Sequence, residues 1–291
     1  MRPKGAGARP FGTVPIPMTA VYPPDHHLLR DLRFSFEHDA DGRRSRAWMP
    51  VARELCTDLG HARPGVLATL VDVIGGGLAA SAAAPGWIAT ADLTLHLVGA
   101  ARPGSVVEAR AEVLRAGRTT VVLEVALVDE RERNVGIATM SFAVLPRRET
   151  NPEVDRVRDS PSTMATAGSR LDRPLLEELG VQVRDPARGV IEVPVTDWSR
   201  NSMGSMQGGV VATVAEVAAE TALRAATNEQ LVVTDLQVTY LGFGRVGPVR
   251  TTAEALGTGD GHGSARVELV DAGAESRQMT VVHAVATRGL T

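Results

Sequence analysis

A polar loop that leads into an apolar helix carries the residues best suited to acid–base chemistry. The segment reads Asn201-Ser-Met-Gly-Ser-Met-Gln207-Gly208-Gly209-Val-Val-Ala-Thr-Val-Ala-Glu216. Glu216 follows a run of small and apolar residues, and a carboxylate is rarely buried unless it is paired or used. The first N–H groups of a helix lack intrahelical acceptors and favour negative charge. A shielded carboxylate close to such N–H groups is suited to activating water, or to attacking a carbonyl whose oxygen becomes an anion.

The same segment occurs a second time, earlier in the chain. Residues 57–72 align with residues 201–216 without a gap, at a constant separation of 144 positions. Gly65 matches Gly209, and Asp72 matches Glu216. Two copies of one candidate site predict a tandem duplication, whose halves would pack as an internal pseudo-dimer.

Each copy lies within the same order of predicted elements. A long helix is predicted over residues 65–83 and again over 209–227, and both are apolar nearly all round, which is typical of buried helices. Alternating apolar and polar residues follow each helix, as in 90–97 and 232–240. This alternation indicates antiparallel strands with one wet face. We therefore predict an α+β fold of two tandem domains, each an antiparallel sheet wrapped around a long central helix.

Composition shifts divide the chain. Residues 1–24 are rich in Pro, Gly and Ala and are interpreted as an N-terminal arm. Domain 1 is predicted over 25–146 and domain 2 over 173–291. Residues 147–172 carry charge, Ser and Pro without periodicity, which favours a linker. The glycine-rich segment 257–263 does not fit a phosphate-binding pattern and is interpreted as a hairpin turn.

Bulk composition narrows the function classes. The 291 residues carry a net charge of −3 and only 3% aromatic residues, which argues against nucleic-acid binding. Cys56 is the only cysteine, so no internal disulfide forms and a reducing, cytoplasmic location is expected. We find no signal peptide and no run long enough to span a membrane. The histidines show no metal-ligand spacing, so no metal is expected.

The loop-and-helix segment resembles the hotdog superfamily of acyl-CoA thioesterases, in particular the phenylacetate-pathway and 4-hydroxybenzoyl-CoA type. The family pattern is an Asn or Gln, then His-Gly-Gly, then an Asp or Glu on the central helix. In the second half Asn201, the two glycines and Glu216 fit, while Gln207 stands where His is usual. In the first half Gly65 and Asp72 fit. The departures there are Thr57, Arg63 and Pro64.

This resemblance implies a cofactor-free thioester hydrolase of double-hotdog form. The implied substrate is an acyl-CoA, and an acyl-carrier-protein thioester is the alternative. Thr90 falls where such enzymes often carry a Ser or Thr that assists the acid. Sheet edges or faces left exposed would allow a homo-oligomer.

Helix geometry predicts that each site is shared between the halves. Gly208 and Glu216 are eight positions apart, which is about 12 Å along a helix, so one carbonyl cannot touch both. The working groups must therefore come from two neighbouring antiparallel helices. Site one would combine Asp72 and Thr90 with Asn201, Gln207 and the Gly208 amide. Site two would combine Glu216 with Thr57, Arg63, Pro64 and Gly65.

The two predicted sites are unequal. Proline has no N–H, so site two lacks the oxyanion donor at Pro64, and we expect it to be degenerate. Arg63 would then bind a ligand phosphate or pair with Glu216.

The sequence also allows structural roles for the candidate site residues, and functions other than thioester hydrolysis. Asp72 and Glu216 could each be held by a loop amide, and Asn201 could hold a turn. The substitution at Gln207 favours an inactive acyl-CoA-binding or regulatory protein on the same fold. A hotdog dehydratase or hydratase is a third alternative, but it needs a histidine paired with the acid.

Overall fold

The computed structural model describes residues 22–39, 41–146 and 161–290. Half 1 contains α1 (Leu28–Asp31), β1 (Ser35–His38), β2 (Arg44–Pro50), α2 (Pro64–Ala83), β3 (Trp87–Leu97), β4 (Val106–Ala116), β5 (Thr120–Asp129) and β6 (Asn134–Leu145). Half 2 contains α3 (Leu175–Glu178), β8 (Gln182–Asp185), β9 (Val190–Val193), α4 (Gly208–Thr227), β10 (Val232–Tyr240), β11 (Val249–Gly259), β12 (His262–Asp271) and β13 (Arg277–Thr287). The short strand β7 (Ser162–Thr163) lies between them, and 3-10 turns cover Arg53–Leu55, Pro186–Arg188 and Asp197–Ser199.

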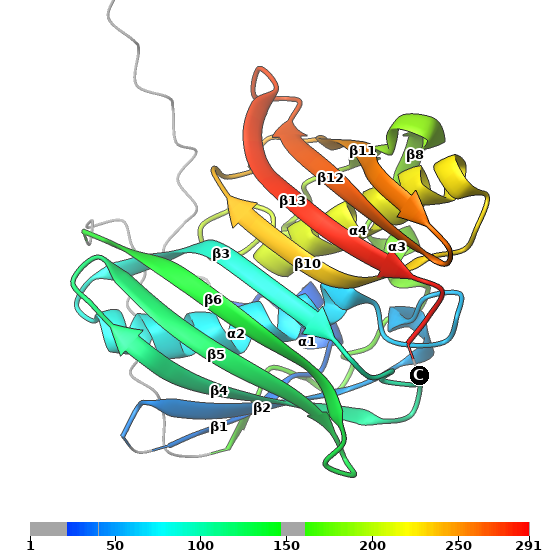
Figure 1. Ribbon diagram of the computed structural model, residues 1–291. Coiled ribbons are helices and arrows are strands. Elements are labelled where there is room, and N and C mark those ends of the chain that lie inside the picture. Colours follow the sequence, from blue (N-terminus) through cyan, green and yellow to red (C-terminus); the bar gives the residue numbers. More distant parts are fainter. Residues whose placement is uncertain (1–21, 40, 147–160, 291) are drawn as a thin grey trace, which may run out of the picture.

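The strands of both halves form one continuous antiparallel sheet. Its order is β7-β1-β2-β4-β5-β6-β3-β10-β13-β12-β11-β9-β8, so the six strands from β1 to β3 are mirrored in order by those from β10 to β8. In Figure 1 the strands of half 1 curve around α2 and those of half 2 curve around α4. The chain is therefore two tandem hotdog domains, as the sequence predicts.

The halves meet where β3 pairs with β10. Leu93 pairs with Val238, and Leu95 pairs with Leu236. These two pairs are equivalent under a sequence separation of 143, so a local two-fold axis passes through the pair between Thr94 and Gln237. Across the same seam, His96 Nδ1 lies 2.6 Å from Asp235, and the Thr239 hydroxyl donates to Asp92 at 2.9 Å.

The central helices match their predicted positions closely. Both are 20 residues long, and their first residues lie 144 positions apart. Pro64 occupies the first turn of α2, where a missing N–H costs nothing, and Asn228 ends α4 in the left-handed conformation. By length and hydropathy α2 would pass as a membrane-spanning helix, but it is a core helix packed against β2 to β6.

The end of the segment predicted as a linker forms a short strand. Ser162–Thr163 pairs with β1 as β7, because its short extended backbone completes the edge of half 1. Residues 147–160 lie outside the described residues, as do residues 1–21 of the predicted N-terminal arm. The glycine-rich segment 257–263 forms the turn of the β11–β12 hairpin, as predicted.

Candidate active site

Helices α2 and α4 run antiparallel in close contact, and glycines set the distance between them. A Cβ added at Gly209 would lie 2.3 Å from the Thr69 Cα, and one at Gly65 would lie 2.3 Å from the Thr213 Cα. Real side chains cannot approach a backbone this closely, so both positions require glycine. The result is that the start of each helix lies against the middle of the other.

At site one, Asp72 lies opposite the start of α4. A Cβ added at Gly208 would lie 2.6 Å from Oδ2 of Asp72, so only glycine leaves the carboxylate in this place. The Thr90 hydroxyl donates to Asp72 Oδ1 at 3.0 Å. Burial raises the pKa of Asp72 from 3.8 to about 6, and the hydrogen bond from Thr90 partly opposes that rise. The carboxylate is therefore shielded yet ionised at neutral pH, as a general base must be.

The start of α4 is held by a residue that the sequence analysis did not single out. The Tyr240 hydroxyl donates to the Gly208 carbonyl oxygen at 2.9 Å, which fixes the first peptide of the helix. Burial and the nearby Asp72 charge raise the pKa of Tyr240, so the hydroxyl stays protonated and donates. The repeat contained a signal for this role. Tyr240 is equivalent to Leu97 in the first half, so only the second half has a hydroxyl at this position.

Asn201 and Gln207 have different surroundings. Asn201 Oδ1 accepts hydrogen bonds from the N–H groups of Met203, at 2.9 Å, and Ser205, at 3.1 Å, so its carbonyl oxygen holds the loop turn. Gln207 occupies the N-cap position of α4, and its own N–H donates to the Ser199 carbonyl at 2.9 Å. The Gln207 side chain is only 7% exposed and makes no hydrogen bond within the described residues. Its amide can therefore donate to a ligand bound at the start of α4.

At site two, the acid is fully engaged. Glu216 is 0% exposed, and it accepts hydrogen bonds from Arg63 Nη1 at 2.8 Å and from the Gly65 N–H at 2.7 Å. Arg63 also lies 3.8 Å from Glu220. Thr57 lies away from the acid, with its hydroxyl 3.4 Å from His61 Nε2. Of the two roles predicted for Arg63, the structure therefore shows pairing with Glu216. The Glu216 carboxylate also satisfies the Gly65 N–H at the start of α2.

The two sites differ in whether the acid accepts a hydrogen bond from the facing helix N–H. In the described structure Asp72 accepts no hydrogen bond from the Gly209 N–H, the counterpart of the bond between Glu216 and Gly65. Aspartate is one methylene shorter than glutamate, so its carboxylate stops short of the facing amide. Site one therefore keeps both an unpaired carboxylate oxygen and available N–H groups.

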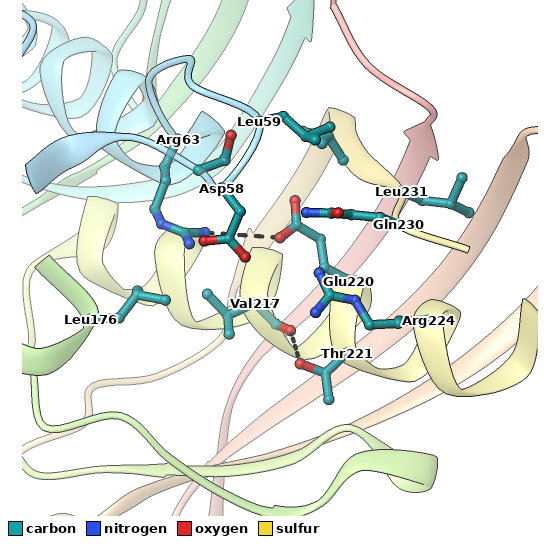
Figure 2. Close-up of a pocket in the computed structure, with 12 residues that line it drawn as sticks. Asp58, Leu59, Arg63, Leu176, Val217, Glu220, Thr221, Arg224, Gln230 and Leu231 are labelled. Carbon is teal, nitrogen blue, oxygen red and sulfur yellow. Dashed lines mark hydrogen bonds and ion pairs between the residues drawn. The ribbon is translucent and has the colours of Figure 1, made fainter. Parts of the chain in front are cut away.

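A pocket of about 190 Å³ lies beside site two, between the loop of half 1 and the exposed face of α4 (Figure 2). Its lining combines polar residues, among them Thr57, Arg63, Glu220, Thr221, Arg224 and Gln230, with apolar ones such as Leu59, Leu176 and Leu231. Burial and the Glu216 charge raise the pKa of Glu220 to about 8. Among the described residues, no group of His, Cys, Asp and Glu has the geometry of a metal site.

Comparisons with known proteins agree with this architecture. The family model described as "Thioesterase superfamily" matches residues 59–135 and 203–276, one match in each half. None of the curated proteins matches this chain.

Solved structures with the same fold span nearly the whole chain. A candidate thioesterase from Novosphingobium aromaticivorans is 18% identical with a TM-score of 0.58, and the match covers 87% of this chain and 98% of that one. An acyl-ACP thioesterase from Bacteroides thetaiotaomicron is 11% identical with a TM-score of 0.56, covering 85% and 99%. A 12:0-ACP thioesterase from Umbellularia californica is 8% identical with a TM-score of 0.57, covering 84% and 93%. At these identities the likeness concerns the fold.

Proposed function

Given that this chain belongs to the thioesterase superfamily and is a thioester hydrolase, we propose that it cleaves an acyl-CoA thioester at one composite site between its halves. Asp72 of half 1 would act on the thioester carbonyl, and the start of α4 in half 2 would hold the carbonyl oxygen. The observation that carries this proposal is the position of the Asp72 carboxylate against Gly208, where a Cβ would lie 2.6 Å from Oδ2.

The chemistry follows from these positions. The ionised Asp72 removes a proton from water, and the resulting hydroxide adds to the carbonyl carbon. Negative charge develops on the carbonyl oxygen, where the helix N–H groups and the Gln207 amide can donate to it. The tetrahedral intermediate expels the thiolate, which takes the proton from Asp72, and the products are a carboxylic acid and a thiol. Direct attack by Asp72 on the carbonyl is the second route open to the same group.

Thr90 and Tyr240 would orient this machinery. Thr90 restrains one oxygen of Asp72, so the other oxygen faces the start of α4. Tyr240 fixes the Gly208 peptide from its carbonyl side. Held in this way, the N–H groups need not reorganise as charge develops, which is the main source of stabilisation in such sites.

Site two is proposed to be inactive. The Glu216 carboxylate accepts from Arg63 and from the Gly65 N–H, so neither the acid nor the helix donor is free. An acyl-carrier-protein thioester remains the alternative substrate. A cytoplasmic location and assembly into a homo-oligomer belong to the same proposal.

The first experiment is a hydrolysis panel of short, medium, long and aromatic acyl-CoAs, followed by release of free thiol. We expect Asp72→Asn to lower kcat/KM by about 10²–10⁴-fold, the usual contribution of a general base. Glu216→Gln, the matched change at site two, should retain most of the activity per folded molecule. The opposite pattern would assign the reaction to site two.

A negative panel is also informative. No turnover of any thioester, together with measurable binding of CoA esters, would favour the non-catalytic acyl-CoA-binding protein. That alternative draws on Gln207, which stands where the family usually has His. Hydration of a crotonyl-type thioester would instead favour the hydratase.

A further inference from the structure

The face of α2 next to Asp72 is apolar and incompletely covered. Val73 and Ala80 are half-buried, and Gly77 between them is exposed. Among the described residues, a Cβ added at Gly77 would meet no atom within 4 Å, and one at Gly76 would meet only the Phe142 ring, at 4.0 Å. Open space therefore begins one turn beyond the proposed catalytic carboxylate.

The duplication identifies what this space corresponds to in the other half. Positions 144 further along on α4 are Val217, Glu220, Thr221 and Arg224, and all four line the pocket beside site two (Figure 2). In order, they match Val73, Gly76, Gly77 and Ala80. The exposed face of α2 is therefore the counterpart of an observed pocket wall.

Contacts on the opposite wall support the same correspondence. Leu59 and Gln230 both line the pocket beside site two. Their counterparts, at separations of 144 and 143, are Met203 and Trp87, and Trp87 Nε1 lies 3.3 Å from Met203 Sδ. The strand irregularities match as well, because the register shifts between Thr90 and Asp92 and again between Val233 and Asp235.

The two equivalent spaces differ in polarity along the helix face. Beside site two, Glu220, Thr221 and Arg224 offer charge and hydroxyl groups. Beside site one, the same positions are two glycines and an alanine, and tryptophan replaces Gln230. A hydrocarbon group beside site two would remove charged and hydroxyl groups from water, which is unfavourable. Beside site one it would bury apolar surface, which is favourable.

One buried polar group marks the reactive end of this space. Arg63 lines the pocket beside site two, and its counterpart at site one is Gln207. The Gln207 side chain is 7% exposed and has no hydrogen-bond partner among the described residues. A side-chain amide N–H can donate to a carbonyl oxygen, and a thioester carbonyl is an acceptor of this kind.

We propose that the acyl group of the substrate is an extended or ring-bearing hydrocarbon that lies along Val73, Gly76, Gly77 and Ala80, bounded by Trp87 and Met203. Gly77 then determines the bulk that the site accepts, because any side chain there projects into the space that the acyl group fills. This inference rests on the proposed function, since it places the thioester carbonyl between Asp72 and the start of α4.

The test compares Gly77→Leu with Ala82→Leu. Ala82 is exposed on the same helix and lies about 180° around the helix axis from Val73, so it carries the same added side chain away from the site. Hydrolysis of acetyl-, decanoyl- and phenylacetyl-CoA would be measured for each variant. Binding of S-decyl-CoA, a thioether that cannot be hydrolysed, would be compared with binding of CoA by calorimetry.

We expect Gly77→Leu to lower kcat/KM for the decanoyl and phenylacetyl esters at least about tenfold more than it lowers kcat/KM for the acetyl ester. It should also abolish the preference for S-decyl-CoA over CoA, while Ala82→Leu changes neither measurement. Leucine favours helix over glycine, so loss of folding is not expected to explain the effect.

Two results would overturn the inference. One is an equal loss on all three esters, and the other is wild-type binding of S-decyl-CoA no tighter than CoA. Failure of the proposed function looks different, because the wild type would then hydrolyse no ester while still preferring S-decyl-CoA to CoA in a manner sensitive to Gly77→Leu.

Discussion

Asp72 and Glu216 occupy equivalent positions and differ by one methylene, yet their surroundings are opposite. Glu216 reaches the Gly65 N–H at 2.7 Å and is also paired with Arg63. Among the residues that the structure describes, Asp72 accepts a side-chain hydrogen bond only from Thr90, at 3.0 Å. The shorter acid thus stays available for chemistry, and the longer one becomes part of the core.

The raised pKa of Asp72 links activity and stability to pH. Its folded pKa of about 6 exceeds the ordinary 3.8, so the folded protein binds this proton more tightly than the unfolded chain does. The contribution of Asp72 to stability is therefore fully present below pH 3.8 and is lost as pH rises through 6. At neutral pH the buried charge costs roughly 3 kcal/mol. Asp72→Asn should therefore raise the free energy of unfolding by up to that amount, although it lowers kcat/KM.

The same carboxylate should set the acid limb of the activity profile. We expect kcat/KM of the wild type to rise with pH through about 6 as Asp72 ionises. Thr90→Val removes the hydrogen bond that lowers this pKa, so its acid limb should move to higher pH. A profile that is flat from pH 5 to pH 8, or a Thr90→Val limb displaced to lower pH, would contradict the assignment.

Arg63 and Gln207 stand at equivalent positions and give a second matched pair. Arg63→Ala leaves Glu216 buried without its cation, which typically costs about 3–5 kcal/mol. Gln207→Ala removes a side chain with no hydrogen bond among the described residues, so stability should change little while kcat falls. Denaturant unfolding and kinetics on both variants would test this, and equal losses of stability would argue against the asymmetry.

At the scale of the elements, glycines decide how the two helices cross. Gly65 and Gly209 each face a threonine backbone on the other helix, at a distance that excludes any Cβ. Close contact brings the start of one helix within reach of a carboxylate on the other. Without these glycines the helices would separate, and neither acid would meet a helix N-terminus.

Alanine at either glycine should therefore destabilise the fold. We expect Gly65→Ala and Gly209→Ala each to lower the free energy of unfolding by about 1–3 kcal/mol, the usual cost of overpacking. Because either Cβ would push the two helices apart, both variants should also lower kcat/KM per folded molecule. Gly77→Ala is the control, because open space surrounds it and alanine should stabilise the helix by about 1 kcal/mol. Unchanged stability at Gly65 and Gly209 would refute the close helix crossing.

At the scale of the whole molecule, the seam between β3 and β10 joins the halves into one sheet. Leu95 and Leu236 are paired there, and both are buried in the common core. Contacts between α2 and α4 add a second connection. The halves are therefore expected to unfold together rather than as independent domains.

Unfolding in denaturant tests this coupling. Far-UV circular dichroism and tryptophan fluorescence should give coincident transitions, since Trp48 lies within half 1 while Trp87 and Trp198 each contact a residue of the other half. Leu95→Ala and Leu236→Ala should each move the whole transition, with a loss of about 2–5 kcal/mol. Two separate transitions, with one variant affecting only one of them, would show independent halves.

The sequence alone determined the duplication, the α+β fold and the positions of both central helices. These follow from local signals, namely a repeat at a constant separation of 144, alternating strands and an apolar helix. It also predicted that the acid of one half would meet the helix start of the other, because eight helical positions are too long a span for one carbonyl.

Only the tertiary structure decided which groups are free. The capture of Glu216 by Arg63 and by the Gly65 N–H, and the support of Gly208 by Tyr240, depend on residues far apart in sequence. Ser162–Thr163 completed a sheet edge for the same reason. A repeat shows which positions are equivalent, but a difference of one methylene in reach between Asp72 and Glu216 takes effect only when the opposite helix is in place.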